Sequence, residues 1–296
     1  MTKDGGFYER FPYPLNHTHH DDAQTTLLRI LRSTDIGSRP KAVLDAGCGT
    51  GAFSRVLRAA FPNATIYSVD RSYASLSRLS QRDDLTDIVP VLHDFESGPL
   101  ERTIADVVIF CHGVLHHCEQ PKVALANILR SCRKIEFAWI WLYSQSGRYE
   151  IEMIRKVATE LGRTETKKEE YGFELIREIR SFFPSSVAAD YQLCRNYTTE
   201  NNALDAEMED RLMIADRYMN PVAKHYSVGA AFKLLSQCGL RVVDAPTLSG
   251  SVVASEFLER RGVRPKGMKY LSLLEKLVRP SGIGYIAVDS TRSTID

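Results

Sequence analysis

The stretch Leu44-Asp45-Ala46-Gly47-Cys48-Gly49-Thr50-Gly51 decides the fold of this chain. An apolar strand at 42–44 leads into it, and a helical pattern at 53–61 follows it. Glycines at such a turn let the backbone bend sharply and approach a bound molecule that any Cβ would push away. With Ala52 as its last residue the string also fits G-x-G-x-x-A, a dinucleotide fingerprint that is weak alone. The turn therefore predicts a ligand-binding unit of strand, turn and helix.

Strands and helices alternate along the chain on both sides of this turn. We expect further strands at 64–69, 88–92, 105–111, 135–143, 240–244 and 283–288. Strands separated by short helices are typical of βαβ units, in which a parallel sheet is covered on both faces. The predicted fold class is α/β, with a doubly wound, seven-stranded and mostly parallel sheet.

A helical insert is expected after the fifth strand. Candidate helices lie at 150–161, 169–183 and 202–218, and a smaller basic helical insert is expected at 256–278. Inserts that follow the carboxyl ends of strands lie over the ligand crevice of such folds. The expected organisation has an N-terminal cap segment and helix (1–40), a ligand-binding α/β domain (41–148 and 221–296) and a helical lid or substrate wall (149–220).

Composition and charge exclude several classes of protein. Among the 296 residues, 38 are Lys or Arg and 37 are Asp or Glu, so the net charge of +1 makes a nucleic-acid partner unlikely, although a basic stretch at 260–269 leaves a local contact open. No apolar run reaches the roughly 20 residues that span a bilayer. The cysteines form no C-x-x-C pair, and no apolar leader begins the chain. These features predict a reduced, cytoplasmic protein without a membrane partner.

Three acidic residues end the first three predicted strands. Asp45 is awkward beside a pyrophosphate but suits an ammonium or a sulfonium, because like charges repel at short range. Asp70 is placed to accept hydrogen bonds from two ribose hydroxyls, and Asp94 to accept one from an adenine amine. A ligand with a cation, a ribose and an adenine but no phosphate is S-adenosyl-L-methionine.

These motifs resemble those of the class I S-adenosylmethionine-dependent methyltransferases. Residues 45–51 resemble the family's D-x-G-C-G-T-G motif, and residues 93–95 resemble its adenine-contacting motif. In one bacterial subgroup of the family, G-V-L-H-H stands where this chain has residues 113–117. The lead-in at 8–14 (Y-E-R-F-P-Y-P) and the string at 142–148 (L-Y-S-Q-S-G-R) resemble the same subgroup. The resemblance covers residues 8–148 well and residues 221–288 loosely.

The resemblance implies a Rossmann-like fold, S-adenosyl-L-methionine as the cofactor, and a cofactor site that begins in the lead-in and ends at the fourth strand. Its expected residues are Tyr8, Tyr13, Asp45, Gly47, Cys48, Gly49, Gly51, Asp70, Arg71, Asp94, Phe95, Cys111 and His112. No metal site is expected, because no cysteine or carboxylate motif joins His17, His19 and His20.

Methyl transfer to a hydroxyl or an ammonium is helped by a general base, and a histidine is the usual group. The candidates are His117, His20 and His225. A positioning role for His117 and a buried core role for His225 are the alternatives. The aromatic residues of the helical insert suit an apolar small molecule, and they equally suit a helical core or the interface of a homodimer.

The sequence therefore predicts a methyltransferase for a small-molecule acceptor at oxygen, nitrogen or carbon. Three alternatives remain open at this point. They are a methyltransferase for RNA or protein, an S-adenosylmethionine-binding protein without methyl transfer, and a nicotinamide-dependent oxidoreductase, against which Asp45 argues.

Overall fold

The computed structural model describes residues 6–14, 40–85, 87–162, 169–182, 211–249, 252–265 and 267–291. The expected helix after residue 20, together with His17, His19 and His20, lies outside these residues.

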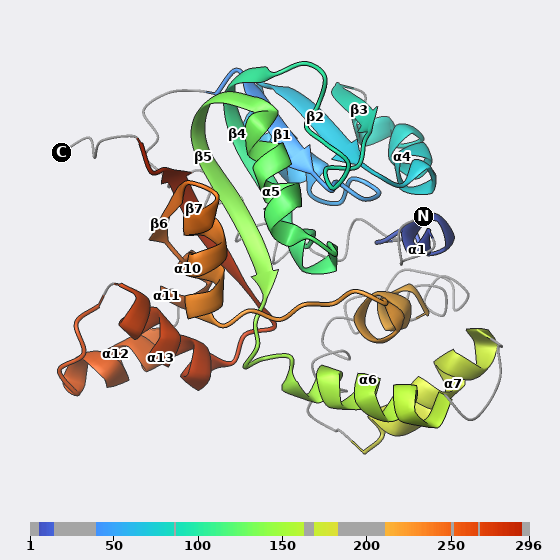
Figure 1. The fold of residues 1–296 in the computed structure, drawn as a ribbon, viewed down its shortest axis with the longest axis vertical. Coiled ribbons are helices and arrows are strands. Elements are labelled where there is room, and N and C mark those ends of the chain that lie inside the picture. Colours follow the sequence, from blue (N-terminus) through green and yellow to red (C-terminus); the bar gives the residue numbers. More distant parts are fainter. Residues whose placement is uncertain are drawn as a thin grey trace.

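A single seven-stranded sheet forms the centre of the fold, in the order β3-β2-β1-β4-β5-β7-β6 (Figure 1). Its strands are β1 (Ala42–Ala46), β2 (Thr65–Asp70), β3 (Ile88–Leu92), β4 (Ile104–His112), β5 (Cys132–Tyr143), β6 (Leu240–Asp244) and β7 (Gly282–Asp289). The strands from β3 to β5 pair in parallel, and β7 is antiparallel to both of its neighbours. This arrangement confirms the predicted Rossmann-like, doubly wound and mostly parallel sheet.

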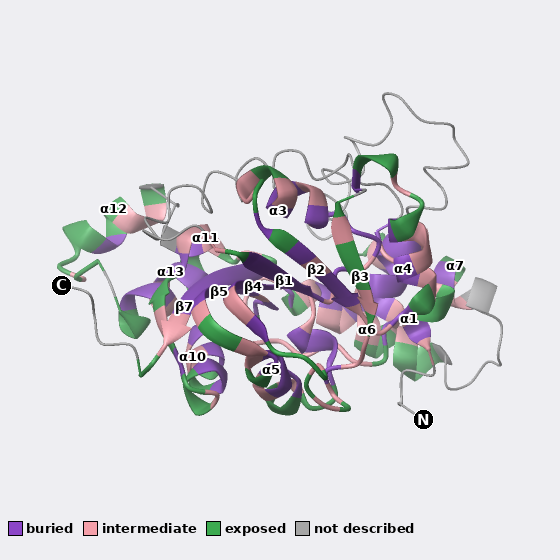
Figure 2. Cartoon of the chain, turned by 90° about the horizontal axis from the view of Figure 1, so that it is seen from above, coloured by how far each residue is buried: buried purple, intermediate pink, exposed green. Residues whose placement is uncertain are grey.

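Helices cover both faces of the sheet, as the apolar central strands require. All five residues of β1 are buried, which is the pattern of a strand covered on two sides. Figure 2 shows α3 (Ser54–Ala60) on one face and α5 (Pro121–Arg130) and α10 (Val228–Gln237) on the other. The chain also forms α4 (Tyr73–Ser80), η1 (Asp83–Leu85) and η2 (Leu115–His117) between the strands.

The helical insert has its own apolar core. It contains α6 (Tyr149–Gly162), α7 (Glu169–Arg180) and a short helix from residue 211 that continues as the π-helix η3 (Ala215–Met219). Ile154, Phe173 and Ile214 pack there with Phe7 of the N-terminal helix α1 (Phe7–Arg10). Figure 1 shows α6 and α7 beyond the end of the sheet toward which β5 points.

The second insert differs from the expectation of one helical segment at 256–278. After a short α11 (Pro246–Ser249) the chain forms two helices, α12 (Val252–Arg260) and α13 (Met268–Val278). Gly262 has a φ of +76° and follows the end of α12, where its amide donates to the Glu259 carbonyl oxygen. A glycine in the left-handed region is a common helix end, and it divides the segment here.

No helix in the described ranges is long and apolar enough to cross a membrane.

The glycine turn after β1 is held tightly against its neighbours. The amides of Gly47 and Cys48 both donate to the Val69 carbonyl oxygen, at 2.7 and 3.1 Å. Gly47 has a φ of +77°, and a Cβ at this position would overlap the side chain of Val114. The turn therefore needs glycine both for its backbone conformation and for the space that Val114 fills.

We expect Gly47→Ala to lower the free energy of unfolding by roughly 3 kcal/mol, from the left-handed backbone and from overpacking against a stiff β-branched side chain. Gly262→Ala is the matched control, because Gly262 also has a positive φ but no atom near its missing Cβ. That variant should lose only about 1 kcal/mol. Urea unfolding measures both, and equal losses would contradict the proposed packing role of Gly47.

Candidate active site

The carboxylate of Asp45 is buried at the end of β1. Its residue is 2% exposed, and Oδ2 accepts a hydrogen bond of 2.8 Å from the Ser54 hydroxyl. Burial raises the pKa of Asp45 to about 7, the charge of Asp70 adds to the shift, and the Ser54 hydrogen bond opposes it. No cation pairs with Asp45 in the part of the chain that the structure describes. Asp45 is therefore an acid whose charge lacks a partner.

Asp70, at the end of β2, connects the glycine turn to α4. Its Oδ2 accepts from the amide of Gly49 and its Oδ1 from the amide of Ser72, both at 2.8 Å. Burial raises the pKa of Asp70, while the two amides and Arg71 oppose the shift. Each carboxylate oxygen has a further lone pair, so the group retains the capacity to accept hydrogen bonds from a ligand.

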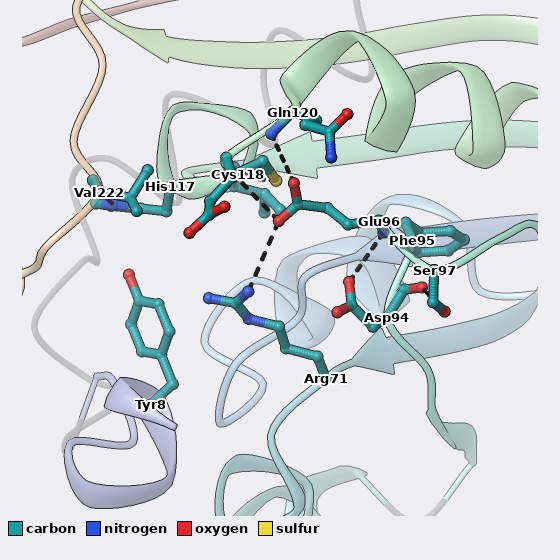
Figure 3. Close-up of polar contacts among 12 residues, drawn as sticks. Tyr8, Arg71, Asp94, Phe95, Glu96, Ser97, His117, Cys118, Gln120 and Val222 are labelled. Carbon is teal, nitrogen blue, oxygen red and sulfur yellow. Dashed lines mark hydrogen bonds and ion pairs between the residues drawn. The ribbon is translucent and has the colours of Figure 1, made fainter. Parts of the chain in front are cut away.

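The loop after β3 brings together Asp94, Phe95 and Glu96 (Figure 3). Oδ1 of Asp94 accepts from the amide of Glu96 at 2.9 Å, and Phe95 is buried beneath it. Glu96 lies 3.8 Å from the guanidinium of Arg71 and accepts from the amide of Gln120 at 2.6 Å. Glu96 thus connects the loops after β2, β3 and β4, and it is a residue that sequence reasoning missed.

The side chains of Cys48, Cys111 and His112 pack against other side chains of the protein. Cys48 packs in a small cluster with residues of α4, and Cys111 is completely buried in the main core. The His112 ring stacks between those of Phe53 and Trp141, with centroid separations of 4.2 and 4.7 Å. Open space instead faces Gly113, where a Cβ would have no neighbour within 4 Å.

The N-terminal segment lies across the glycine turn. The Thr50 hydroxyl donates to the Pro14 carbonyl oxygen at 2.6 Å, and the Ser72 hydroxyl donates to that of Tyr8 at 3.1 Å. The Glu9 carboxylate accepts two amides at the start of α4, at 2.7 and 3.1 Å. A Cβ at Gly49 would overlap the carbonyl oxygen of Tyr13. Tyr8 and Tyr13 are therefore brought to the same end of the sheet as Asp45 and Asp70.

A buried polar network joins this segment to β5 and to the insert. Asp216 of η3 accepts hydrogen bonds from the hydroxyls of Tyr8 (3.0 Å) and Tyr143 (3.2 Å). The side-chain amide of Asn220 donates to the Tyr8 hydroxyl at 2.9 Å. Residues far apart in the sequence thus meet at the carboxyl end of β5. π-helical turns such as η3 are frequent at functional sites.

His117 is part of this network, and its neighbours fix its tautomer. Nδ1 lies 2.7 Å from the Val222 carbonyl oxygen, which only accepts, so Nδ1 carries the proton. Nε2 then carries a lone pair and lies 3.2 Å from the Tyr143 hydroxyl, whose single proton can go either to Nε2 or to Asp216. The Asp216 carboxylate is itself 3.7 Å from Nε2. Burial lowers the pKa of His117, and Asp216 opposes that shift. The neutral ring has the form that a general base requires.

His225 and His116 also lie beside Tyr143, with ring centroids 6.1 and 3.5 Å from that of the tyrosine. Nδ1 of His225 is 3.7 Å from the Glu152 carboxylate. Burial and nearby arginines lower its pKa to about 4. The ring of His116 stacks on that of Tyr143 at 3.5 Å. His117 and His225 are thus gathered around one tyrosine, whereas His20 lies outside the described residues. Among those residues, no group of three or more histidine, cysteine or acidic side chains is arranged to hold a metal ion.

Tyr143, Asp216 and Asn220 are candidate site residues that sequence reasoning did not select. Tyr143 stands in the L-Y-S-Q-S-G-R string, so its motif was a usable signal. Asp216 and Asn220 lie in a helical block without a motif, and only their contacts in the fold identify them.

Replacing Asp45 by Asn tests whether the pKa of Asp45 is raised in the folded protein. A raised pKa means that the native state holds the proton more tightly than the unfolded chain, so stability falls as pH rises from about 4 to about 7. Asp45→Asn keeps a hydrogen-bond acceptor for Ser54 and removes this loss. We expect the variant to melt higher than the wild type near pH 8, with a smaller difference near pH 5. A difference independent of pH would contradict the raised pKa.

Part of the chain is similar to known proteins. Residues 44–135 match the family described as a methyltransferase domain. The chain is 27% identical over 217 residues to an uncharacterized protein of Synechococcus sp., covering 71% of this chain and 49% of that protein. It is 34% identical over 99 residues to malonyl-[acyl-carrier protein] O-methyltransferase of Methylococcus capsulatus, covering 33% and 36%. The chain thus spans about half the length of the first relative and about a third of the second.

A solved structure extends the similarity of fold to almost the whole chain. PKMT2 from Rickettsia typhi in complex with AdoHcy superposes with a TM-score of 0.60 and 13% identity, over 95% of this chain and 56% of that one. Residues 44–135 are therefore similar to a methyltransferase domain, and the sheet around them has the Rossmann-like fold that this relative shares.

Proposed function

We propose that this protein is a class I S-adenosyl-L-methionine-dependent methyltransferase. The observation that carries the proposal is the pair of buried carboxylates, Asp45 and Asp70, beside the glycine turn. Burial raises the pKa of both, and no full ion pair with a described cation offsets the charge of Asp45. The methyltransferase-domain match over residues 44–135 includes both acids and supports the same reading.

The residues present fit this cofactor. Its ammonium and sulfonium groups provide the positive charge that Asp45 lacks among the described residues, and an opposite charge favours the ionised acid. The remaining lone pairs of Asp70 suit ribose hydroxyls, and those of Asp94 suit an adenine amine beside Phe95. Gly113 leaves the backbone open at the end of β4. The proposed cofactor residues are those named from the sequence, with Cys111 and His112 supporting the site through packing.

When bound, the cofactor supplies a methyl group on a sulfonium: the acceptor's lone pair forms the new bond to carbon, and the S–C bond pair stays on sulfur. The protein must hold the acceptor in line and exclude water. Tyr8 of the N-terminal segment and Asp216 of the insert meet at Tyr143, which is 5% exposed, and we assign the exclusion of water to this contact. Nε2 of His117 is the group that we assign to take the acceptor's proton, directly or through the Tyr143 hydroxyl.

The acceptor that we propose is a small molecule. The helical insert contributes Asp216 to the network around Tyr143, and the net charge of +1 does not favour RNA. A relative that is similar over 99 residues is named as an O-methyltransferase. This similarity supports oxygen as the acceptor atom to test first. An RNA or protein acceptor remains the alternative to this proposal. The division into domains, the cytoplasmic location and the homodimer stay predictions.

Calorimetric titration with S-adenosylmethionine, S-adenosylhomocysteine and NAD tests the proposal. We expect binding of the first two and none of NAD. Asp70→Asn should weaken both interactions by roughly tenfold or more, because charge-assisted hydrogen bonds are lost. Asp83→Asn is the control, since Asp83 is an exposed acid of η1 and should bind as the wild type does. Binding of NAD, or silence from all three ligands in folded protein, would refute the proposed cofactor.

A further inference from the structure

Arg148 is a buried cation, and two of its nitrogens have no hydrogen-bond partner among the described residues. The residue is 3% exposed and is the last residue of the loop between β5 and α6. Nε and Nη2 are both buried, and neither has a partner among the described residues. The guanidinium carbon lies 3.2 Å from the centre of the Tyr143 ring. Buried donors are normally paired, and a charged one left unpaired is costly, so this arrangement requires an explanation.

The loop that carries Arg148 is fixed rather than adaptable. The Ser144 hydroxyl donates to the buried Glu275 carboxylate at 3.0 Å, and the Arg148 amide donates to the Ser144 carbonyl oxygen at 3.3 Å. A Cβ at Gly147 would overlap the Pro280 carbonyl group, so the backbone passes α13 and β7 closely. The fold therefore holds the guanidinium beside Tyr143.

The charges around Arg148 are unbalanced toward the positive. Arg155 lies 3.7 Å from Glu152 and donates to the Asn220 carbonyl oxygen at 2.6 Å, so its guanidinium has partners. The positive charge of Arg148 contributes, after burial, to the lowered pKa of both Arg155 and Arg217. Glu152 and Asp216 are the acids that oppose this shift at Arg155, so two carboxylates face the three arginines Arg148, Arg155 and Arg217. One further anion would balance the charge of this group of described residues.

We propose that the methyl acceptor carries an oxyanion, a carboxylate or a phosphate, which binds along the Nε and Nη2 edge of Arg148. This edge presents two parallel N–H donors, the geometry that pairs with two oxygens of one oxyanion. The inference rests on the proposed methyltransferase function and names the substrate class of that same site.

The cofactor's own carboxylate is a poorer occupant for this position. Arg148 lies beyond the end of β5, which is two strands from β1 in the sheet, or roughly 10 Å at the usual strand spacing. The proposed cofactor residues Asp45 and Asp70 end β1 and β2. An anion at Arg148 would instead place an acceptor beside Tyr143, whose hydroxyl lies 3.2 Å from Nε2 of His117.

Small anions test the site without knowledge of the acceptor. Protein saturated with S-adenosylhomocysteine is titrated with acetate, inorganic phosphate and acetamide at constant ionic strength, and calorimetry and thermal unfolding follow binding. We expect acetate or phosphate to bind and to raise the melting temperature, and acetamide to do neither. A response to acetate alone indicates a carboxylate acceptor, and a response to phosphate alone indicates a phosphorylated one.

Variants then assign the effect to Arg148. Arg148→Gln should weaken anion binding by roughly tenfold or more, and Arg148→Lys, which keeps the charge but not the planar fork, should lie between. Lys156→Gln, an exposed cation of α6, should leave binding unchanged. Equal anion responses in the wild type and Arg148→Gln would overturn the proposal.

If Arg148→Gln does not fold, the wild-type titrations still test the proposed anion site. No response to either anion, or a response to acetamide as large as that to acetate, overturns the site. Failure of S-adenosylhomocysteine to bind in the same titrations would refute the proposed function instead, so the two failures are distinguishable.

Discussion

The two hydrogen bonds that Asp216 accepts from Tyr8 and Tyr143 join the three parts of this molecule. Tyr8 belongs to the N-terminal segment, Tyr143 ends β5 and Asp216 lies in the π-helix of the insert. The sheet by itself supplies only the edge at which these parts meet. Because Tyr143 and Asp216 are buried and Tyr8 is half-buried, loss of one hydrogen bond would leave a polar group unsatisfied. The network therefore couples the placement of the segment over the glycine turn to the placement of the insert over β5.

Ionic groups of opposite sign lie on either side of this network. Asp45, at the end of β1, is a buried acid whose pKa rises to about 7. Arg148, beyond β5, is a buried cation, and two of its nitrogens have no partner in the part of the chain that the structure describes. Neither pairs with the other across the strands between them. Buried charges of this kind lower stability unless something neutralises them, and they are typical of sites built for a ligand. One molecule with a cationic centre on the first side and one with an anionic group on the second would relieve both.

Local patterns made the fold and half of the site predictable from the sequence. The glycine string and the acids that end the strands lie within a few residues of the elements that position them, so their spacing carries the information. Asp216 and Asn220 could not be found in this way, because they meet Tyr8 across more than 200 residues of chain. Arg148 was visible in a motif, but its role follows only from its burial and from the absence of a partner. The division between α12 and α13 depends on the φ of Gly262, which the helical periodicity of 256–278 conceals.

The proposed anion has a consequence for the base. Burial lowers the pKa of His117, and the charge of Arg148 adds to that shift. An oxyanion bound to the guanidinium would cancel the contribution of Arg148, since a negative charge nearby favours the protonated imidazole. His117 would then accept a proton more readily once the acceptor is in place than in the free protein. Under this arrangement Arg148 would orient the acceptor and would also keep the pKa of His117 low until the acceptor binds. Proton transfer to His117 would then depend on the presence of the molecule that loses the proton.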